Sequence, residues 1–284
     1  MGRIISLVKL ELLMQSPYPY LLIVAAITFS TIYFPTLQVA REVLHIEVPR
    51  TQSLNAEEIR LEIYKSSLIL LKDFFDKFRN EIFIPWIAIA ISASYGLSIS
   101  NSLKRERLRF ILSFPISKSK YLLLKIVITW TLLYISFYIT FYSLLFLRFG
   151  STYIASIYPI AYLREFILIS SVSIFIAVLT MNEFVTTFSG IIGWIFSNYI
   201  FSTLFTTPDN YSLIYSIEPY QSFGLMDKIT EVFKGDEIGI YLGIPPDALD
   251  NAVTLTNLYT IYIVVTSLIL IILTLIIFER REID

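Results

Sequence analysis

Long apolar runs constrain this chain more than any other feature of its sequence. Residues 166–206 carry a single charged side chain, Glu183, and as one helix they would be about 60 Å long, twice the thickness of the hydrocarbon core of a bilayer. Similar runs recur along the chain, of which 56% is hydrophobic and only 16% is charged. In ordinary soluble domains about a quarter of the residues are charged. The sequence therefore predicts an integral membrane protein.

We expect an all-α transmembrane domain of six spans within residues 1–284. The run 166–206 has to fold into a helical hairpin, and Met181-Asn182-Glu183 is its natural turn. The expected spans are residues 18–37, 82–100, 121–147, 160–181, 184–205 and 255–278. The segments around them are an interfacial helix at 1–17, external segments at 38–81 and 206–254, a loop at 101–120 and a tail at 279–284.

The N-terminal segment mixes polar and apolar residues at roughly helical spacing, which suits a helix lying in the plane of the lipid headgroups. A secretory signal peptide is the alternative. We reject it because Lys9 and Glu11 interrupt the apolar run and no small-residue cleavage site follows. Pro17 and Pro19 then end this helix, since proline lacks an N–H donor and clashes with the preceding turn.

The first external segment contains a second amphipathic pattern. Asn55 and Glu58 form a potential N-terminal capping pair, and apolar residues from Ile59 to Phe78 follow on one stripe. The stripe fits an external helix that covers the mouth of the bundle, and it fits an extension of the second span equally well. In the other external segment, Asn210-Tyr211-Ser212 is a glycosylation acceptor pattern of a kind that also arises by chance.

The distribution of basic residues predicts the orientation in the cell membrane. One short stretch between apolar runs, 101–125, holds many basic residues against one acid, Glu106. Its basic residues are Lys104, Arg105, Arg107, Arg109, Lys118, Lys120 and Lys125. Short loops rich in Lys and Arg stay on the cytoplasmic side. Arg3, Lys9, Arg280 and Arg281 fit the same side, so we expect both termini to be cytoplasmic.

Several function classes lack the residues that they need. The chain has no cysteine, one histidine (His45) and no P-loop, so we expect no metal site, no histidine-based hydrolase and no ATP binding by this chain. Charged residues at Arg148, Arg164, Glu165 and Glu183 fall near the ends of expected spans. Carriers driven by protons or cations usually have ionisable groups within the membrane. A self-powered carrier and an intramembrane enzyme are therefore disfavoured.

The basic stretch also contains an apolar run, Phe110–Phe114, which needs a partner surface or the membrane interface. Its basic residues can also bind lipid headgroups and set the topology. In detail the stretch resembles the coupling loop of permease subunits of type-two ABC exporters. The matching residues are Lys104-Arg105-Glu106-Arg107, Ile111-Leu112-Ser113-Phe114-Pro115, Ile116-Ser117-Lys118 and Leu123-Leu124-Lys125. The ending Phe278-Glu279-Arg280-Arg281 resembles the family's F-x-R-R tail, and Arg107-Leu108 departs from its usual Gly-Thr.

This resemblance implies an export permease that is driven by a separate P-loop ATPase, which binds ATP and Mg²⁺. It implies pairing with a second permease, identical or different, and no nucleic acid partner. A passive channel or membrane scaffold is the alternative. The resemblance implies ATPase docking through Lys104, Arg105, Glu106, Arg107, Leu108, Ile111, Leu112 and Pro115. It implies a pathway lined by spans one, two and five, whose polar residues are Thr28, Ser30, Thr31, Ser92, Ser94, Ser98, Thr186, Thr187, Ser189 and Asn198.

These pathway residues have a second interpretation. Ser and Thr within a span often bond their own backbone or a neighbouring helix.

Overall fold

The computed structural model describes residues 20–21, 23–26, 86–100, 103, 117–149, 159–160, 162–205 and 249–281. Within these ranges the chain is helical, without a strand. The elements are α5 (Ala88–Tyr95), η2 (Gly96–Ser100), α7 (Lys118–Phe149), α9 (Leu163–Thr180), α10 (Glu183–Phe205) and α14 (Leu249–Arg280). Outside the described residues lie the expected interfacial helix, both expected external segments except for residues 249–254, and most of the expected first span.

Four helices in the described part are long and apolar enough to cross a membrane. They are Lys118–Ser143 in α7, Leu163–Thr180 (α9), Glu183–Phe205 (α10) and Asn251–Arg280 in α14. A shorter apolar helix, Ala88–Ser100, coincides with the second expected span. An all-α membrane protein is therefore the class that the described helices support.

Two helices extend beyond the spans expected from hydropathy. The helix α7 begins at Lys118, within the expected loop, and α14 begins at Leu249, within the expected external segment. Hydropathy marks only the apolar part of a helix, whereas lysine is a good helix former outside the membrane and an acid such as Asp250 is favourable in a first turn. Both helices therefore continue past their apolar stretches.

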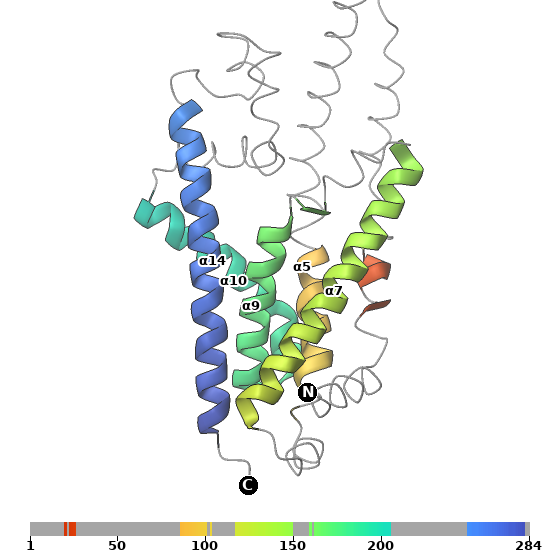
Figure 1. The fold of residues 1–284 in the computed structure, drawn as a ribbon, viewed down its shortest axis with the longest axis vertical. Coiled ribbons are helices and arrows are strands. Elements are labelled where there is room, and N and C mark those ends of the chain that lie inside the picture. Colours follow the sequence, from red (N-terminus) through yellow and green to blue (C-terminus); the bar gives the residue numbers. More distant parts are fainter. Residues whose placement is uncertain are drawn as a thin grey trace, which may run out of the picture.

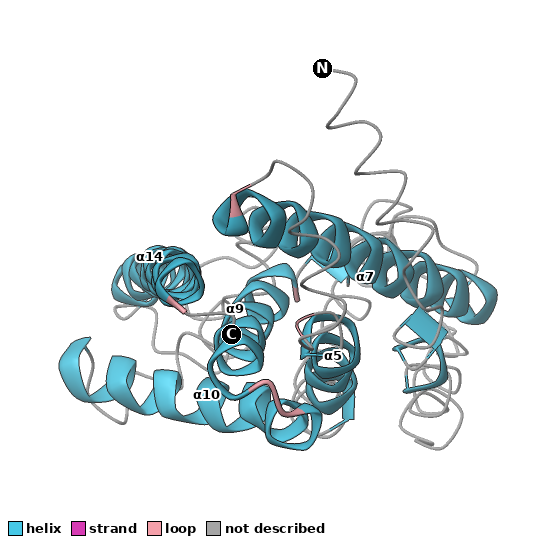
Figure 2. Ribbon diagram, turned by 90° about the horizontal axis from the view of Figure 1, so that it is seen from below, coloured by secondary structure: helices cyan, strands magenta, loops and turns pink. Residues whose placement is uncertain are grey.

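The helix α9 lies at the centre of the described bundle. It packs most extensively against α14 and α10, and α10 packs nearly as extensively against α5. Figure 1 shows α7 starting near the lower ends of α9 and α14 and diverging from them along its length. Seen from below, α7 lies on one side of α5, α9 and α14, and α10 crosses them on the other side (Figure 2). The central helix is thus covered on both sides.

A tight turn joins α9 to α10 at the position that the sequence predicts. Met181 has a left-handed backbone (φ 51°), and its N–H donates to the Ala177 carbonyl at 2.9 Å, which ends α9. The Oδ1 atom of Asn182 accepts from the N–H groups of Phe184 (2.9 Å) and Val185 (3.3 Å), so Asn182 caps the start of α10. The two spans therefore form the expected hairpin.

Helix α5 changes into a π-helical turn, η2, which the sequence pattern does not indicate. Gly96 begins this turn and packs against the start of α10, where a Cβ atom at residue 96 would lie 3.0 Å from the Glu183 carbonyl oxygen. Further along η2, the hydroxyls of Ser98 and Thr129 are 3.2 Å apart and link this turn to α7. The π-turn thus lies between α10 and α7.

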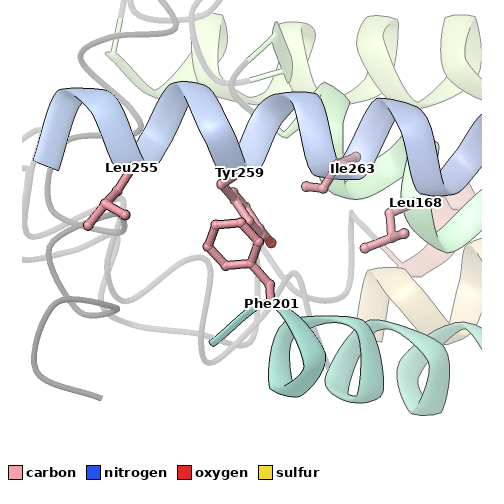
Figure 3. Close-up of a cluster of buried hydrophobic side chains, with 5 residues drawn as sticks. All are labelled: Leu168, Phe201, Leu255, Tyr259 and Ile263. Atoms are coloured by element: carbon pink, nitrogen blue, oxygen red, sulfur yellow. The ribbon is translucent and has the colours of Figure 1, made fainter. Parts of the chain in front are cut away.

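Aromatic residues hold α7 and α14 against the rest of the bundle. On α7, Trp130, Tyr134 and Phe137 surround Phe166 of α9, with ring centroids 5.3–6.1 Å from it. At the other side, Leu168, Phe201, Leu255, Tyr259 and Ile263 form a buried cluster between α9, α10 and α14 (Figure 3). The rings of Phe201 and Tyr259 meet edge to face at 5.0 Å.

Candidate functional site: a hydroxyl seam between the helices

The predicted pathway residues of α5 and α10 include buried hydroxyls, and together with Ser173 of α9 we call these hydroxyls the hydroxyl seam. It consists of Ser92, Ser94, Ser173, Thr186 and Ser189, all of them buried. Gly190 lies at its centre, because a Cβ atom there would be 1.9 Å from the Ser92 Oγ and 3.0 Å from the Ser173 Oγ. Three helices therefore touch where one of them has no side chain, as expected for small residues between membrane helices.

Hydrogen bonds cross the seam between α5 and α9. The Ser173 and Ser92 hydroxyl oxygens are 3.0 Å apart. Each hydroxyl also lies within hydrogen-bond distance of a carbonyl one turn earlier in its own helix, Ala88 for Ser92 (2.9 Å) and Ile169 for Ser173 (2.6 Å). The seam is satisfied by contacts within and between helices.

The remaining hydroxyls of the seam bond their own helices. Ser94 donates to the Ala90 carbonyl at 2.7 Å, Thr186 to Asn182 at 2.7 Å and Ser189 to Thr186 at 2.6 Å. Thr187, beside the seam and half-buried, donates to the Glu183 carbonyl at 2.8 Å. In this arrangement these side chains serve helix packing, which is the second interpretation given above. Thr28, Ser30 and Thr31 lie outside the described residues.

Asn198, the last of the predicted pathway residues, links α10 to α14. Its Oδ1 accepts from the Tyr259 hydroxyl at 2.7 Å, and one residue earlier the Ser197 hydroxyl lies 3.1 Å from the Tyr262 hydroxyl. The Asn198 Nδ2 atom is buried and has no hydrogen-bond partner within the described part of the chain. These polar contacts lie beside the aromatic cluster and fix the register of the two helices.

Two charged residues are buried deeper than their sequence positions suggest. Lys125 in α7 is 4% exposed and Glu165 in the first turn of α9 is 1% exposed. In the sequence, Lys125 belongs to the basic stretch and Glu165 falls near the end of an expected span. Lys125 lies three residues after the buried Leu122 and four residues before the buried Thr129, so helical spacing places the three on one face of α7. This spacing is the sequence signal for the burial of Lys125.

The predicted ATPase-docking residues, 104–115, lie outside the described residues, but the chain on either side of them is described. On the N-terminal side Leu103 is 1% exposed, and its N–H donates to the Ile99 carbonyl of η2 at 3.0 Å. On the other side Ser117 leads directly into α7, and the Tyr121 N–H donates to the Ser117 carbonyl at 3.1 Å. The segment that carries the docking motif is therefore attached to a bundle helix at each end.

Comparison of this chain with known protein families, with curated proteins and with solved structures finds no match.

Proposed function

We propose that this chain is the transmembrane permease subunit of an ATP-driven ABC exporter in the cell membrane. It has six spans with both termini in the cytoplasm, and a separate P-loop ATPase docks on residues 104–115. ATP and Mg²⁺ are bound by that ATPase, and a second permease, identical or different, completes the transporter.

The attachment of the docking segment at both ends carries this proposal. Leu103 is buried and bonded to η2, and the segment returns through Ser117 into the first turn of α7. A partner that displaces residues 104–115 therefore pulls on two helices at once.

The contacts of η2 supply a route from the docking segment into the bundle. The π-turn packs against α9 and α10, and α5 continues from it along the hydroxyl seam. Because Gly190 and Ser92 bring α5 and α10 into direct contact, a tilt of α5 cannot leave α10 in place. ATPase closure would thus open or close a pathway beside α5 and α10 by moving whole helices.

A passive channel is the competing function, and a flux measurement on the purified chain separates the two. Without its ATPase, the chain in sealed phospholipid vesicles should dissipate a K⁺ gradient no faster than protein-free vesicles do. The expected tightness follows from the self-satisfied hydroxyls of the seam. Gramicidin-treated vesicles provide the leak control. Rapid K⁺ loss caused by the chain alone, without ATP, would favour the channel.

A further inference from the structure

The C-terminal end of α14 meets the first turn of α7 and the last turn of α9. Figures 1 and 2 both show these three helix ends close together. We call the contacts among them the C-terminal clasp, formed by the side chains of Lys118, Ser119, Glu279 and Arg281 with backbone carbonyls of α9 and α14. Ser119 is 160 positions from Glu279 and Val178 is 103 from Arg281, so folding rather than local structure brings these residues together.

On the α7 side, the clasp satisfies the start of a helix. The Glu279 carboxylate accepts from the Ser119 N–H at 2.9 Å and from the Ser119 hydroxyl. The first N–H groups of a helix have no partner within it, and the helix dipole favours a negative charge there. The Lys118 Nζ also donates to the Arg281 carbonyl at 2.8 Å. The end of α14 thus supplies both an acid and a carbonyl to the first turn of α7.

On the α9 side, the same end of α14 supplies a cation. The Arg281 Nη1 donates to the Val178 carbonyl at 2.8 Å and lies 3.5 Å from the Leu179 carbonyl, both in the last turn of α9. A positive charge is favourable at a helix C-terminus, where carbonyls lack partners in the helix. The fully buried Phe278 anchors this segment. One short segment therefore complements two helix ends of opposite polarity.

The clasp joins α7 to α9 at a second place, besides the aromatic contact around Phe166 in the middle of α7. Direct packing between α7 and α9 is otherwise sparse beside that of α9 with α14 and α10, and α7 diverges from α9 and α14 along its length (Figure 1). The first turn of α7 also directly follows the segment that carries the docking motif. We propose that Glu279 and Arg281 are positioning residues that join the start of α7 to the end of α9, so that both helix ends move as one unit.

This role rests on the proposed function, in which the docked ATPase displaces the docking segment and with it the start of α7. Displacement of α7 reaches α9 through α14, in addition to the route through η2. The turn that follows α9 leads directly into α10, so the clasp ties the docking segment to the same hairpin that forms the hydroxyl seam.

A distance measurement between spin labels tests the clasp. The chain has no cysteine, so Lys120→Cys and Phe184→Cys can be labelled specifically. Both side chains are exposed and outside the clasp, one in the first turn of α7 and the other just beyond the α9–α10 turn. In lipid nanodiscs, with no other protein present, we expect one narrow distance distribution. Glu279→Ala and Arg281→Ala should broaden it and shift it to longer distances.

Three further variants serve as controls for the distance measurement. Arg280→Ala removes a charge from the same tail, at an exposed side chain with no hydrogen bond to another described residue, and should leave the distribution narrow. Glu279→Gln keeps an acceptor oxygen for Ser119 and should largely restore the parent distribution. Ser119→Ala should broaden it less than Glu279→Ala, because the backbone N–H remains, and it serves if a clasp variant fails to fold.

Unchanged distributions in folded Glu279→Ala and Arg281→Ala proteins would overturn the proposal. Equal broadening in Arg280→Ala would also overturn it, since the effect would then be one of tail charge. No ATPase takes part in this experiment. Failure of the clasp would therefore leave ATPase docking untouched, and failure of ATPase docking would leave the measured clasp intact.

Discussion

Substitution of Gly190 by leucine is expected to separate α10 from α5 and α9 and to lower the thermal stability of the protein sharply. The new Cβ alone would lie 1.9 Å from the Ser92 Oγ and 2.8 Å from the Ile169 Cγ2, far inside van der Waals contact. Overpacking of a closed core typically costs about 1–3 kcal/mol. Because a leucine adds three further carbons at a three-helix contact, we expect the upper end of this range or more. Thermal unfolding in detergent, followed by circular dichroism, measures it.

Matched variants separate this contact from a general effect of size. Gly190→Ala should destabilise less than Gly190→Leu, and adding Ser92→Gly should recover part of the loss because the shortest contact disappears. Ile192→Ala, at a side chain that is 64% exposed two residues away, should change stability little. Unfolding of the Gly190→Leu protein at the temperature of the parent would show that α10 does not pack as described.

Replacement of Leu108, Ile111 and Leu112 by serine is expected to abolish retention of the partner ATPase. These positions are spaced at i, i+3 and i+4, so a helix over them presents all three on one face. Truncation of the few hot-spot residues of an interface costs about 2 kcal/mol or more each, and about 1.4 kcal/mol corresponds to a tenfold change in affinity. We therefore expect the amount of ATPase purified with the tagged chain to fall more than about tenfold.

Leu123→Ser is the control for this experiment, since Leu123 is 45% exposed on α7 and lies outside the docking segment. It makes the same chemical change and should leave ATPase retention at the parent level. Equal retention by the triple variant, in a protein that still folds and inserts, would remove the docking role from residues 104–115.

Hydropathy predicts the existence of the described spans because burial in lipid demands long uncharged helices. The hairpin turn is predictable for a local reason, since Asn182 is a good N-cap and Glu183 is the one charge in its run. The helix ends are less predictable. Both α7 and α14 continue past their apolar parts, where hydropathy carries no information about helix length.

The sequence does not predict the contacts between segments that are far apart along the chain. Helical spacing from buried neighbours can reveal that Lys125 lies inside the bundle, but only once the buried face of α7 is known. The F-x-R-R ending is visible in the sequence through a resemblance. Its partners, Ser119 and the last carbonyls of α9, are not, because they follow from how three helices are packed together. The sequence offers a packing role for the pathway hydroxyls as one of two interpretations, but which helices they join depends on the placement of Gly190.

ATP hydrolysis by the purified assembly is the decisive test of whether an ATPase drives this chain. The tagged full chain would be extracted in mild detergent from the cells that normally produce it, and Mg²⁺-dependent ATP hydrolysis measured against a mock purification. We expect hydrolysis that copurifies with the chain and falls to the mock level in the variant with Leu108, Ile111 and Leu112 replaced by serine. A folded, membrane-inserted chain that purifies with no ATP hydrolysis above the mock level would contradict it.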